Sequence, residues 1–477
     1  MNIEISLNYS VKKQINSIWT FGGNTCHAPL LLRKDLLNHL KMAKDQLGFK
    51  YIRCHGSLSD DMGTVKADGS YDFSNIYKMI DNLLEIGLRP FFGFCAMPGL
   101  YATTEAGISH YNFRSAPPKD WNCWYQLIKT LMMSLKKRYG IKELTKWYFE
   151  VWNEPDIAYW TGTQAEYFKL YDLSAKAVKE VDSRLRIGGP ATSVTAWIDE
   201  FITHIKKESV DFGIEGMSRC DFITTHSYPS DLGFSNSASG NVTLQDSSIM
   251  KELFGIVRRK IDDALGKDFP LICGEWNSSA GPYASCHDEC NNAAFIAKVM
   301  DDLSEICQGS LFWDISDIYE EVGFHYHPFH GGYGLISVND IPKSSFNAFK
   351  YLRSLGNKQL AVTISQETQS LGCIATTKGE KTILLLYYYR EPNIEQLESV
   401  TINFKGLPES ALKASVSTIL PGKGSAYETW LEIGKPEFAN RKILETLENA
   451  SMSETTIMDI LRFPVKIKLG TLTRIEL

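Results

Sequence analysis

Residues 147–155 read Trp147-Tyr148-Phe149-Glu150-Val151-Trp152-Asn153-Glu154-Pro155, an aromatic and β-branched run that ends abruptly in Asn-Glu-Pro. Such runs are typical of buried strands, so this one predicts a strand that delivers the carboxylate of Glu154 to its exit. A second run of the same design, residues 270–274, leads into Glu275. Cleavage of a glycosidic bond needs such a pair, because one carboxyl group donates a proton while the other attacks or stabilises the anomeric carbon.

Short apolar runs alternate with longer amphipathic segments between about residue 17 and residue 345, which is the pattern of repeated βα units. The predicted strands are residues 18–22, 51–55, 89–94, 146–152, 185–189, 222–226, 271–274 and 310–314. This α/β pattern predicts a (β/α)8 TIM barrel over residues 15–350, with functional groups at the C-terminal ends of the strands. Glu154 and Glu275 follow the fourth and seventh of these strands, so we expect them to face each other across the barrel mouth.

The pattern changes after about residue 356 to alternating strands without long helices, as in residues 381–389 and 400–404. Such alternation, with frequent turn residues, predicts an accessory β-sandwich domain. We assign residues 351–477 to it, together with residues 1–14, which alternate in the same way and could add a strand.

Composition limits the classes of partner. The chain has 477 residues, and 50 Lys plus Arg against 56 Asp plus Glu give a formal charge of −6, which provides no basic surface for nucleic acid or an anionic membrane. No run approaches the roughly 18 apolar residues that span a bilayer, and residues 1–10 lack the features of a signal peptide. We therefore expect a cytoplasmic protein that binds a neutral substrate, with its cysteines reduced and mostly buried.

Two segments, Trp152-Asn153-Glu154-Pro155 and Gly274-Glu275-Trp276-Asn277, look like the active-site segments of the clan of retaining glycosidases built on (β/α)8 barrels. Further segments narrow the resemblance from the clan to one family. The chain most resembles glycoside hydrolase family 39, and within that family it most resembles the β-xylosidases. Those segments are residues 51–56, 60–62, 87–91, 188–191, 226–228, 312–321, 329–335 and 341–343.

The resemblance implies a role for each matched position. Glu154 would be the general acid and base, Glu275 the nucleophile, and Asn153 a ligand of the sugar 2-hydroxyl. It also implies a first sugar subsite lined by His55, His226, Tyr228, Trp313 as an apolar wall, and one or both of Glu320 and Glu321. We also expect Trp152, Trp160 and Trp276 near the sugar. The family likeness further suggests a homotetramer.

Retention of anomeric configuration requires the two carboxyl groups to lie about 5 to 5.5 Å apart. At that separation an ionised Glu275 would raise the pKa of Glu154 and keep it protonated until the leaving group departs. Glu150 shares its side of the strand with Glu154 but lies deeper, where a charge has to be paired, so we expect a structural role for it.

Two clusters suggest a metal, His325-Tyr326-His327 with His330, and Cys286-His287 with Cys290. Neither has a second group of ligands at the spacing of a zinc site, and retaining hydrolysis needs no cofactor. We therefore expect neither a metal nor a cofactor.

The leading hypothesis is an exo-acting, retaining hydrolase that releases terminal β-D-xylose from short oligosaccharides or glycosides, with α-L-arabinopyranosides as a second substrate class. Another specificity within the family is an alternative, either disaccharide release or hydrolysis of iduronides, because Asp156 and Ala280 depart from the xylosidase pattern. A uronate would need a basic partner, for which Arg53 is the main candidate. The remaining alternative is a carbohydrate-binding protein without catalytic activity.

Overall fold

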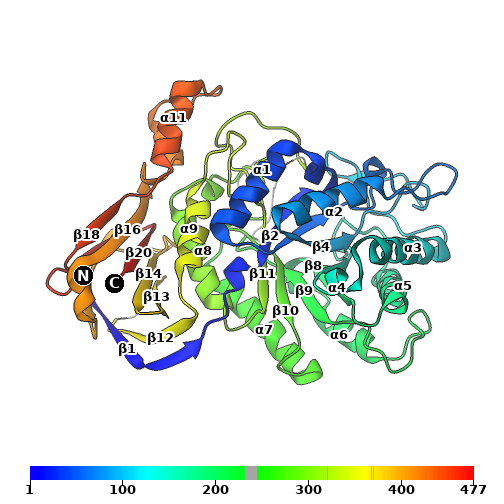
Figure 1. The fold of residues 1–477 in the computed structure, drawn as a ribbon, viewed down its shortest axis with the longest axis horizontal. Helices are drawn as coiled ribbons and strands as arrows, with labels where there is room; N and C mark the ends of the chain where they lie inside the picture. Colours follow the sequence, from blue (N-terminus) through cyan, green and yellow to red (C-terminus); the bar gives the residue numbers. More distant parts are fainter. Residues whose placement is uncertain (231–243, 320, 367, 369) are drawn as a thin grey trace.

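The computed structural model describes residues 1–230, 244–319, 321–366, 368 and 370–477 (Figure 1). Its larger part is a closed barrel of parallel strands in the order β10-β11-β2-β3-β4-β7-β8-β9. The strands are β2 (Gly22–His27), β3 (Tyr51–His55), β4 (Arg89–Phe94), β7 (Tyr148–Val151), β8 (Arg186–Thr192), β9 (Phe222–His226), β10 (Leu271–Glu275) and β11 (Gly309–Phe312).

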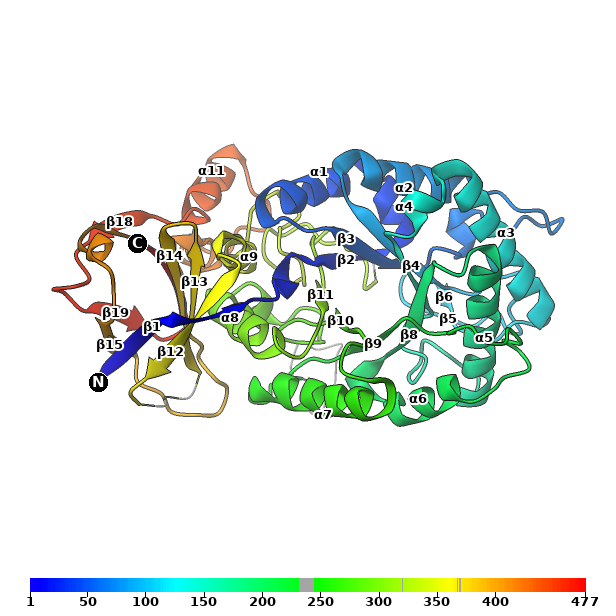
Figure 2. The same ribbon diagram turned by 60° about the horizontal axis from the view of Figure 1, so that its bottom comes forward.

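Helices surround the barrel and cover its outer face (Figures 1 and 2). They are α1 (Lys34–Met42), α2 (Ser74–Ile86), α3 (Trp121–Tyr139), α4 (Ile141–Leu144), α5 (Gln164–Val181), α6 (Ile198–Lys206), α7 (Ser248–Leu265), α8 (Asn291–Leu303) and α9 (Ser344–Ser354). Short helical turns are η1 (Ile18–Thr20), η2 (Ala28–Leu32), η3 (Ala43–Leu47), η4 (Asp60–Met62), η5 (Ser193–Thr195) and η8 (Ser285–His287), and a small hairpin joins β5 (Gly107–Ile108) to β6 (Phe113–Arg114). The helix after β7 begins with a capping box, in which Thr163 and Glu166 satisfy each other's backbone amides.

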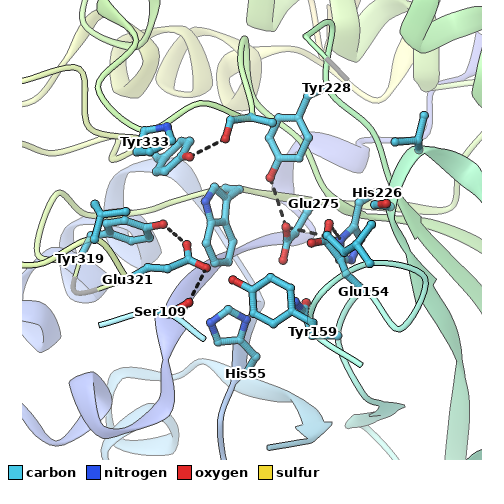
Figure 3. Close-up of a pocket in the computed structure, with 18 residues that line it drawn as sticks. His55, Ser109, Glu154, Tyr159, His226, Tyr228, Glu275, Tyr319, Glu321 and Tyr333 are labelled. Atoms are coloured by element: carbon cyan, nitrogen blue, oxygen red, sulfur yellow. Dashed lines mark hydrogen bonds and ion pairs between the residues drawn. The ribbon is translucent and has the colours of Figure 1, made fainter. Parts of the chain in front are cut away.

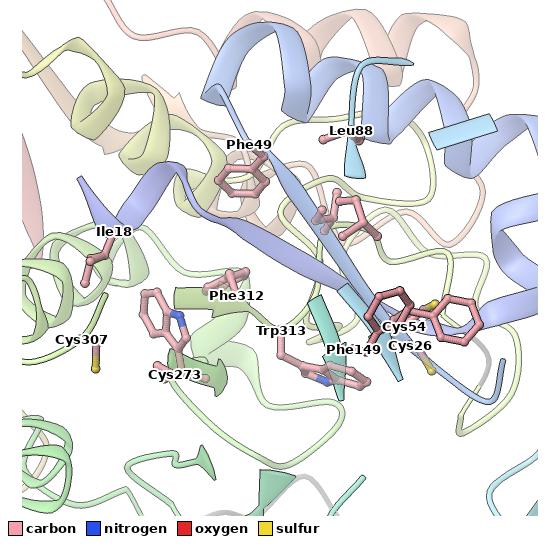
Figure 4. Packing of buried hydrophobic residues seen from close by; sticks show 14 of the residues in the cluster. Ile18, Cys26, Phe49, Cys54, Leu88, Phe149, Cys273, Cys307, Phe312 and Trp313 are labelled. Carbon is pink, nitrogen blue, oxygen red and sulfur yellow. The ribbon is translucent and has the colours of Figure 1, made fainter. Parts of the chain in front are cut away.

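Apolar side chains pack the barrel on both sides of its wall. The large cluster between strands and helices includes Phe49, Phe149 and Phe312 (Figure 4). A smaller cluster inside the barrel joins Phe91, Phe222, Ile272 and Leu311.

The position predicted for the first strand, residues 18–22, is wrong. Ile18–Thr20 form the turn η1 instead, with Ile18 and Trp19 buried, and the strand begins at Gly22. A Cβ at Gly22 would lie 2.0 Å from the carbonyl oxygen of Tyr51, so this glycine lets two strands approach closely. An apolar turn at the start of a barrel strand has the same hydrophobic pattern as the strand itself, which explains the error.

The remaining strands form a second sheet in the order β17-β16-β20-β14-β13-β12-β1-β15-β19, with β18 paired to β16. They are β1 (Asn2–Gln14), β12 (Lys358–Ile364), β13 (Leu371–Lys378), β14 (Lys381–Tyr388), β15 (Ser399–Lys405), β16 (Ala414–Pro421), β17 (Gly424–Ser425), β18 (Thr455–Met458), β19 (Val465–Lys468) and β20 (Thr471–Glu476). Between them lie η9 (Glu409–Lys413), α10 (Tyr427–Glu432) and α11 (Arg441–Ala450). The predicted fold class is confirmed, because a closed βα barrel is accompanied by a sheet that fits an accessory domain.

Strand β14 shows how this sheet joins the barrel. Ile383 and Leu385 point to one face and belong to the barrel cluster, whereas Leu384 and Leu386 point to the other face and belong to the sheet's own apolar cluster. Both faces of the strand are therefore buried. No helix in the described part of the chain is both long and apolar enough to cross a membrane.

A buried ion cluster braces the segment that follows β11. The ammonium group of Lys343 lies 2.5 Å from Asp288 and 2.6 Å from Asp317, and all three side chains are at most 1% exposed. Lys343 also donates to the carbonyl oxygen of Gly332. The two carboxylates accept from the amides of Gly331 and Gly334, so one cluster holds the whole turn.

We predict that Lys343→Met lowers the free energy of unfolding by about 3–5 kcal/mol, because it leaves two buried carboxylates without their cation. Thermal and denaturant unfolding measure the loss. The matched control is Lys381→Met, since Lys381 pairs with Glu476 while 64% exposed, and should cost about 1 kcal/mol or less. Equal losses in the two variants would contradict this account of the cluster.

Candidate active site

A pocket of about 490 Å³ lies at the C-terminal ends of the barrel strands (Figure 3). Its lining comes from the ends of β3, β9 and β10, from the segments that follow β7, β8, β9, β10 and β11, and from the turn between β5 and β6. The pocket is lined by all the described residues to which the family resemblance gave a role: His55, Asn153, Glu154, His226, Tyr228, Glu275, Trp313 and Glu321. Glu320, also predicted, lies outside the described residues.

The two predicted catalytic carboxylates share one imidazole. His226 Nδ1 lies 2.9 Å from Glu154 Oε1 and 3.4 Å from Glu275 Oε2. One oxygen of each carboxylate and this nitrogen all lie within 4.8 Å of one another. Their side chains are 13% exposed for Glu154 and 6% for Glu275, so Glu154 lies nearer to solvent.

The backbone aims Glu154 at the pocket. Its φ is 44°, in the left-handed region, which costs a residue other than glycine on the order of 1–3 kcal/mol. Its amide donates to the carbonyl oxygen of Ala191 at 2.8 Å, which ties the turn after β7 to the end of β8. Neighbouring strands thus hold a conformation that the local sequence disfavours.

Arg53 is the cation beneath the site. It is 1% exposed and donates to Glu275 Oε1 at 2.8 Å and to Glu150 Oε2 at 2.6 Å. The same guanidinium donates to Asn24 Oδ1 at 3.1 Å and to Asn153 Oδ1 at 2.8 Å. Glu150, fully buried, also accepts from Thr224 at 2.6 Å. Glu150 is therefore paired, as its depth in the strand required.

Burial shifts the pKa values of Glu275 and His226. It raises the pKa of Glu275 above its ordinary value, although His226 and Arg53 act in the opposite direction. Burial also lowers the pKa of His226 to about 4, so the ring is neutral at pH 7 and one nitrogen carries its hydrogen. Nε2 has no hydrogen-bond partner, and a Cβ at Gly274 would lie 3.1 Å from it. Nδ1, between two carboxylates, is the nitrogen with an acceptor to bind.

The other predicted residues lie around the two carboxylates. Tyr228 donates its hydroxyl to Glu275 Oε2 at 3.2 Å. His55 is buried, and its Nε2 bonds to the Tyr111 hydroxyl at 2.6 Å. Burial lowers the pKa of His55 well below its ordinary value, with Arg53 adding to the effect. The ring of Trp313 lies 5.5 Å from His55, which forms a mixed polar and aromatic wall.

Glu321 completes the wall on the side away from Glu154 (Figure 3). It bonds to the hydroxyl of Tyr319 and accepts from Ser109 Oγ at 3.3 Å. Burial, reinforced by the charge of Glu154, raises the pKa of Glu321 to about 8. At pH 7 this side chain is therefore a neutral acid that can both donate and accept a hydrogen bond.

Three tryptophans that we expected near the sugar do not line the pocket. Trp152 is fully buried and donates to the carbonyl oxygen of Tyr159, while Trp160 packs edge-on against it at 4.9 Å. Trp276 is also fully buried and packs against Phe312. All three belong to the apolar cluster between the strands and the helices. For Trp276, which directly follows Glu275 at the end of β10, alternation of successive side chains accounts for this direction.

Sequence reasoning missed several residues of the pocket. Tyr319 and Tyr333 belong to segments that carried the family resemblance, so the resemblance was the signal that could have identified them. Ser109, Tyr159 and Val194 lie in irregular loops, where no periodic pattern indicates the direction of a side chain.

The described residues contain one group with the spacing of metal ligands, namely Glu154, His226 and Glu275. Arg53 already provides a positive charge on Glu275. The histidines considered from the sequence make other contacts: His287 bonds to the carbonyl oxygens of Gly331 and Ser279, and His325 stacks on His330 at 4.1 Å.

Comparison with known proteins gives consistent matches. The model of the family described as glycosyl hydrolases family 39 matches residues 1–458. A β-xylosidase of Caldicellulosiruptor saccharolyticus is 37% identical over 460 residues, which cover 94% of this chain and 91% of that protein. A β-xylosidase of Geobacillus stearothermophilus is 32% identical over 92% of this chain and 87% of the relative.

Solved structures agree. The crystal structure described as a monomeric β-xylosidase from Caulobacter crescentus CB15 superposes with a TM-score of 0.86 at 28% sequence identity, covering 99% of each chain. The likeness therefore includes the barrel and the accessory sheet together.

We predict that Glu275→Gln stabilises the protein at pH 7. Because the folded state raises the pKa of Glu275 above the ordinary value of 4.5, ionisation costs folding free energy as pH rises from 4.5 through the folded pKa. A neutral amide avoids this cost, so the variant's unfolding temperature should exceed the wild type's at pH 7, and the difference should vanish below pH 4.5. A less stable variant at pH 7 would mean that the ion pair with Arg53 outweighs the cost of burial.

Proposed function

Since the chain belongs to glycosyl hydrolases family 39, as its motifs predicted, we propose that this glycoside hydrolase is an exo-acting, retaining β-xylosidase. The observation that carries the proposal is the contact of Glu154 and Glu275 with the same nitrogen of His226, which places oxygens of the two carboxylates within 4.8 Å. This separation suits retaining enzymes, whose carboxyl groups lie about 5–5.5 Å apart, better than inverting ones, which need about 6.5–9.5 Å to admit a water.

In the first step the carboxylate of Glu275 attacks the anomeric carbon and forms a glycosyl ester, while the bond from that carbon to the leaving oxygen breaks. Glu154 gives its proton to that oxygen. In the second step Glu154 takes a proton from water, the hydroxide attacks the anomeric carbon, and the ester releases Glu275 as carboxylate. Two inversions retain the configuration. Arg53 holds Oε1 of Glu275, so Oε2, which accepts from Tyr228, is the oxygen proposed to attack.

A terminal pentose suits the pocket. The wall of Tyr319, Glu321 and Ser109 limits the space beyond the sugar on the side away from Glu154, which supports removal of one terminal residue. The neutral acid Glu321 offers both a donor and an acceptor to a sugar hydroxyl. α-L-Arabinopyranose differs from xylose at one hydroxyl and is proposed as a second, poorer substrate.

The charge of the pocket disfavours an iduronide. Among the described residues, no lysine or arginine lines the pocket. Arg53, the basic candidate from the sequence, lies below it and is bonded to Glu150, Glu275 and two asparagines. A purely sugar-binding role is disfavoured too, because a binder has no need for two carboxylates in contact with one imidazole.

Azide rescue tests the two roles. Glu154→Ala should lower kcat by about 10²–10⁴ on an unactivated xyloside, and azide should restore turnover of an aryl β-xyloside with the β-xylosyl azide as product. With Glu275→Ala, azide should give the α-xylosyl azide instead. Proton NMR of the azides identifies the anomers. Exchanged products would reverse the assignment, and an α-anomer as first product of the wild type would refute retention.

The pKa of Glu321 predicts a pH effect on binding. Above pH 8 the wild-type side chain becomes a carboxylate and can no longer donate to the sugar, so KM for an aryl β-xyloside should rise severalfold between pH 7 and pH 9. In Glu321→Gln, which stays neutral, KM should stay flat over this range. Parallel profiles in the two proteins would exclude Glu321 as a sugar ligand.

The pocket described here is formed within one chain, and a solved relative is called monomeric, so the proposal does not depend on the tetramer that the family resemblance suggested. Light scattering coupled to size exclusion gives the assembly directly.

A further inference from the structure

The leaving-group side of the pocket is identified by Glu154, since the acid has to reach the glycosidic oxygen. Ile157 and Val194 line the pocket on the two segments next to this acid. Ile157 follows Glu154 in the turn after β7, and Val194 follows β8, whose Ala191 carbonyl binds the Glu154 amide. Ile157 is 44% exposed and Val194 is half-buried, so both side chains present apolar surface to the leaving group of the substrate.

Val194 is placed there against its backbone preference. Its φ is 48°, a left-handed conformation that is a genuine outlier for a β-branched residue. Thr195 and Trp197 also have positive φ, 57° in each case. Such strain persists only where surrounding contacts impose it, so the segment needs an external clamp.

Asp156 provides the clamp. Its carboxylate accepts from the Ser193 amide at 2.8 Å and from the Ser193 hydroxyl at 2.5 Å. At the other end, Thr192 Oγ1 donates to the Ala196 carbonyl oxygen at 2.7 Å. The hydroxyl groups of Thr192 and Ser193 are thus bonded within the protein. Ile157 and Val194 add hydrocarbon surface to the wall next to Glu154.

From this arrangement we propose that Ile157 and Val194 form an apolar leaving-group subsite that accepts an aryl aglycone in preference to a second sugar. The inference rests on the proposed function. A second sugar would need hydrogen-bond partners to replace the water it loses, and the side chains of Ile157 and Val194 supply none. A flat aromatic group gains binding free energy when it buries apolar surface against Ile157 and Val194.

Val194→Asn tests the subsite without straining the fold, because asparagine has a similar size, is polar and tolerates the left-handed conformation. The ratio of kcat/KM for 4-methylumbelliferyl β-xyloside to that for xylobiose should fall by about three- to tenfold, while the unfolding temperature does not fall. The matched control is Val322→Asn. Val322 also lines the pocket and is 40% exposed, but belongs to the segment after β11, so the ratio should stay unchanged.

A binding measurement separates the subsite from the chemistry. The inhibition constant of phenyl 1-thio-β-xyloside should be larger in Val194→Asn than in the wild type, because the phenyl group binds more weakly. The inhibition constant of methyl 1-thio-β-xyloside should stay the same. An unchanged ratio in Val194→Asn with a lowered ratio in Val322→Asn would place the aglycone on the opposite wall and overturn the inference. No turnover of any xyloside by the wild type would refute the proposed function itself, whereas turnover with equal losses on both substrates would refute the subsite alone.

Discussion

One buried guanidinium organises the centre of this molecule. Arg53 forms ion pairs with Glu150 and Glu275, two buried carboxylates at the centre of the barrel. Burying an unpaired charge is costly, so the position of Glu275 and the closure of the barrel around it depend on the same cation. The amide oxygens of Asn24 and Asn153 accept two more of its hydrogens, and Asn153 is thereby fixed one residue before the proposed acid.

Near Glu154 the carboxylates are linked by a neutral side chain and not by a cation. His226, kept neutral by burial, connects the two carboxylates without adding a second fixed charge. Glu275 is held on one oxygen by Arg53 and approached on the other by His226 and Tyr228. Its raised pKa shows that this pairing does not fully offset burial. A reactive carboxylate that costs folding free energy is expected of an active site, where activity and stability conflict.

Much of this arrangement could be predicted from the sequence, because it depends on strand periodicity. Alternation placed Glu154 and Glu275 at strand ends and Glu150 deeper in the same strand. The conformations of loops could not be predicted this way. Nothing in the residues around Val194 indicates its positive φ, which depends on Asp156 from another loop. The same limit explains the tryptophans: an aromatic residue just past a strand can point into the pocket, as Trp313 does, or into the helix layer, as Trp276 does.

The most direct measurement is to trap the covalent intermediate with an aryl 2-deoxy-2-fluoro-β-xyloside, whose fluorine slows hydrolysis of the ester, and to locate the label by mass spectrometry of peptides. This account predicts one fluoroxylosyl group per chain, on Glu275, with loss of activity at the same rate as labelling. A label on Glu150 or Glu154, or hydrolysis of the reagent without any covalent product, would contradict it.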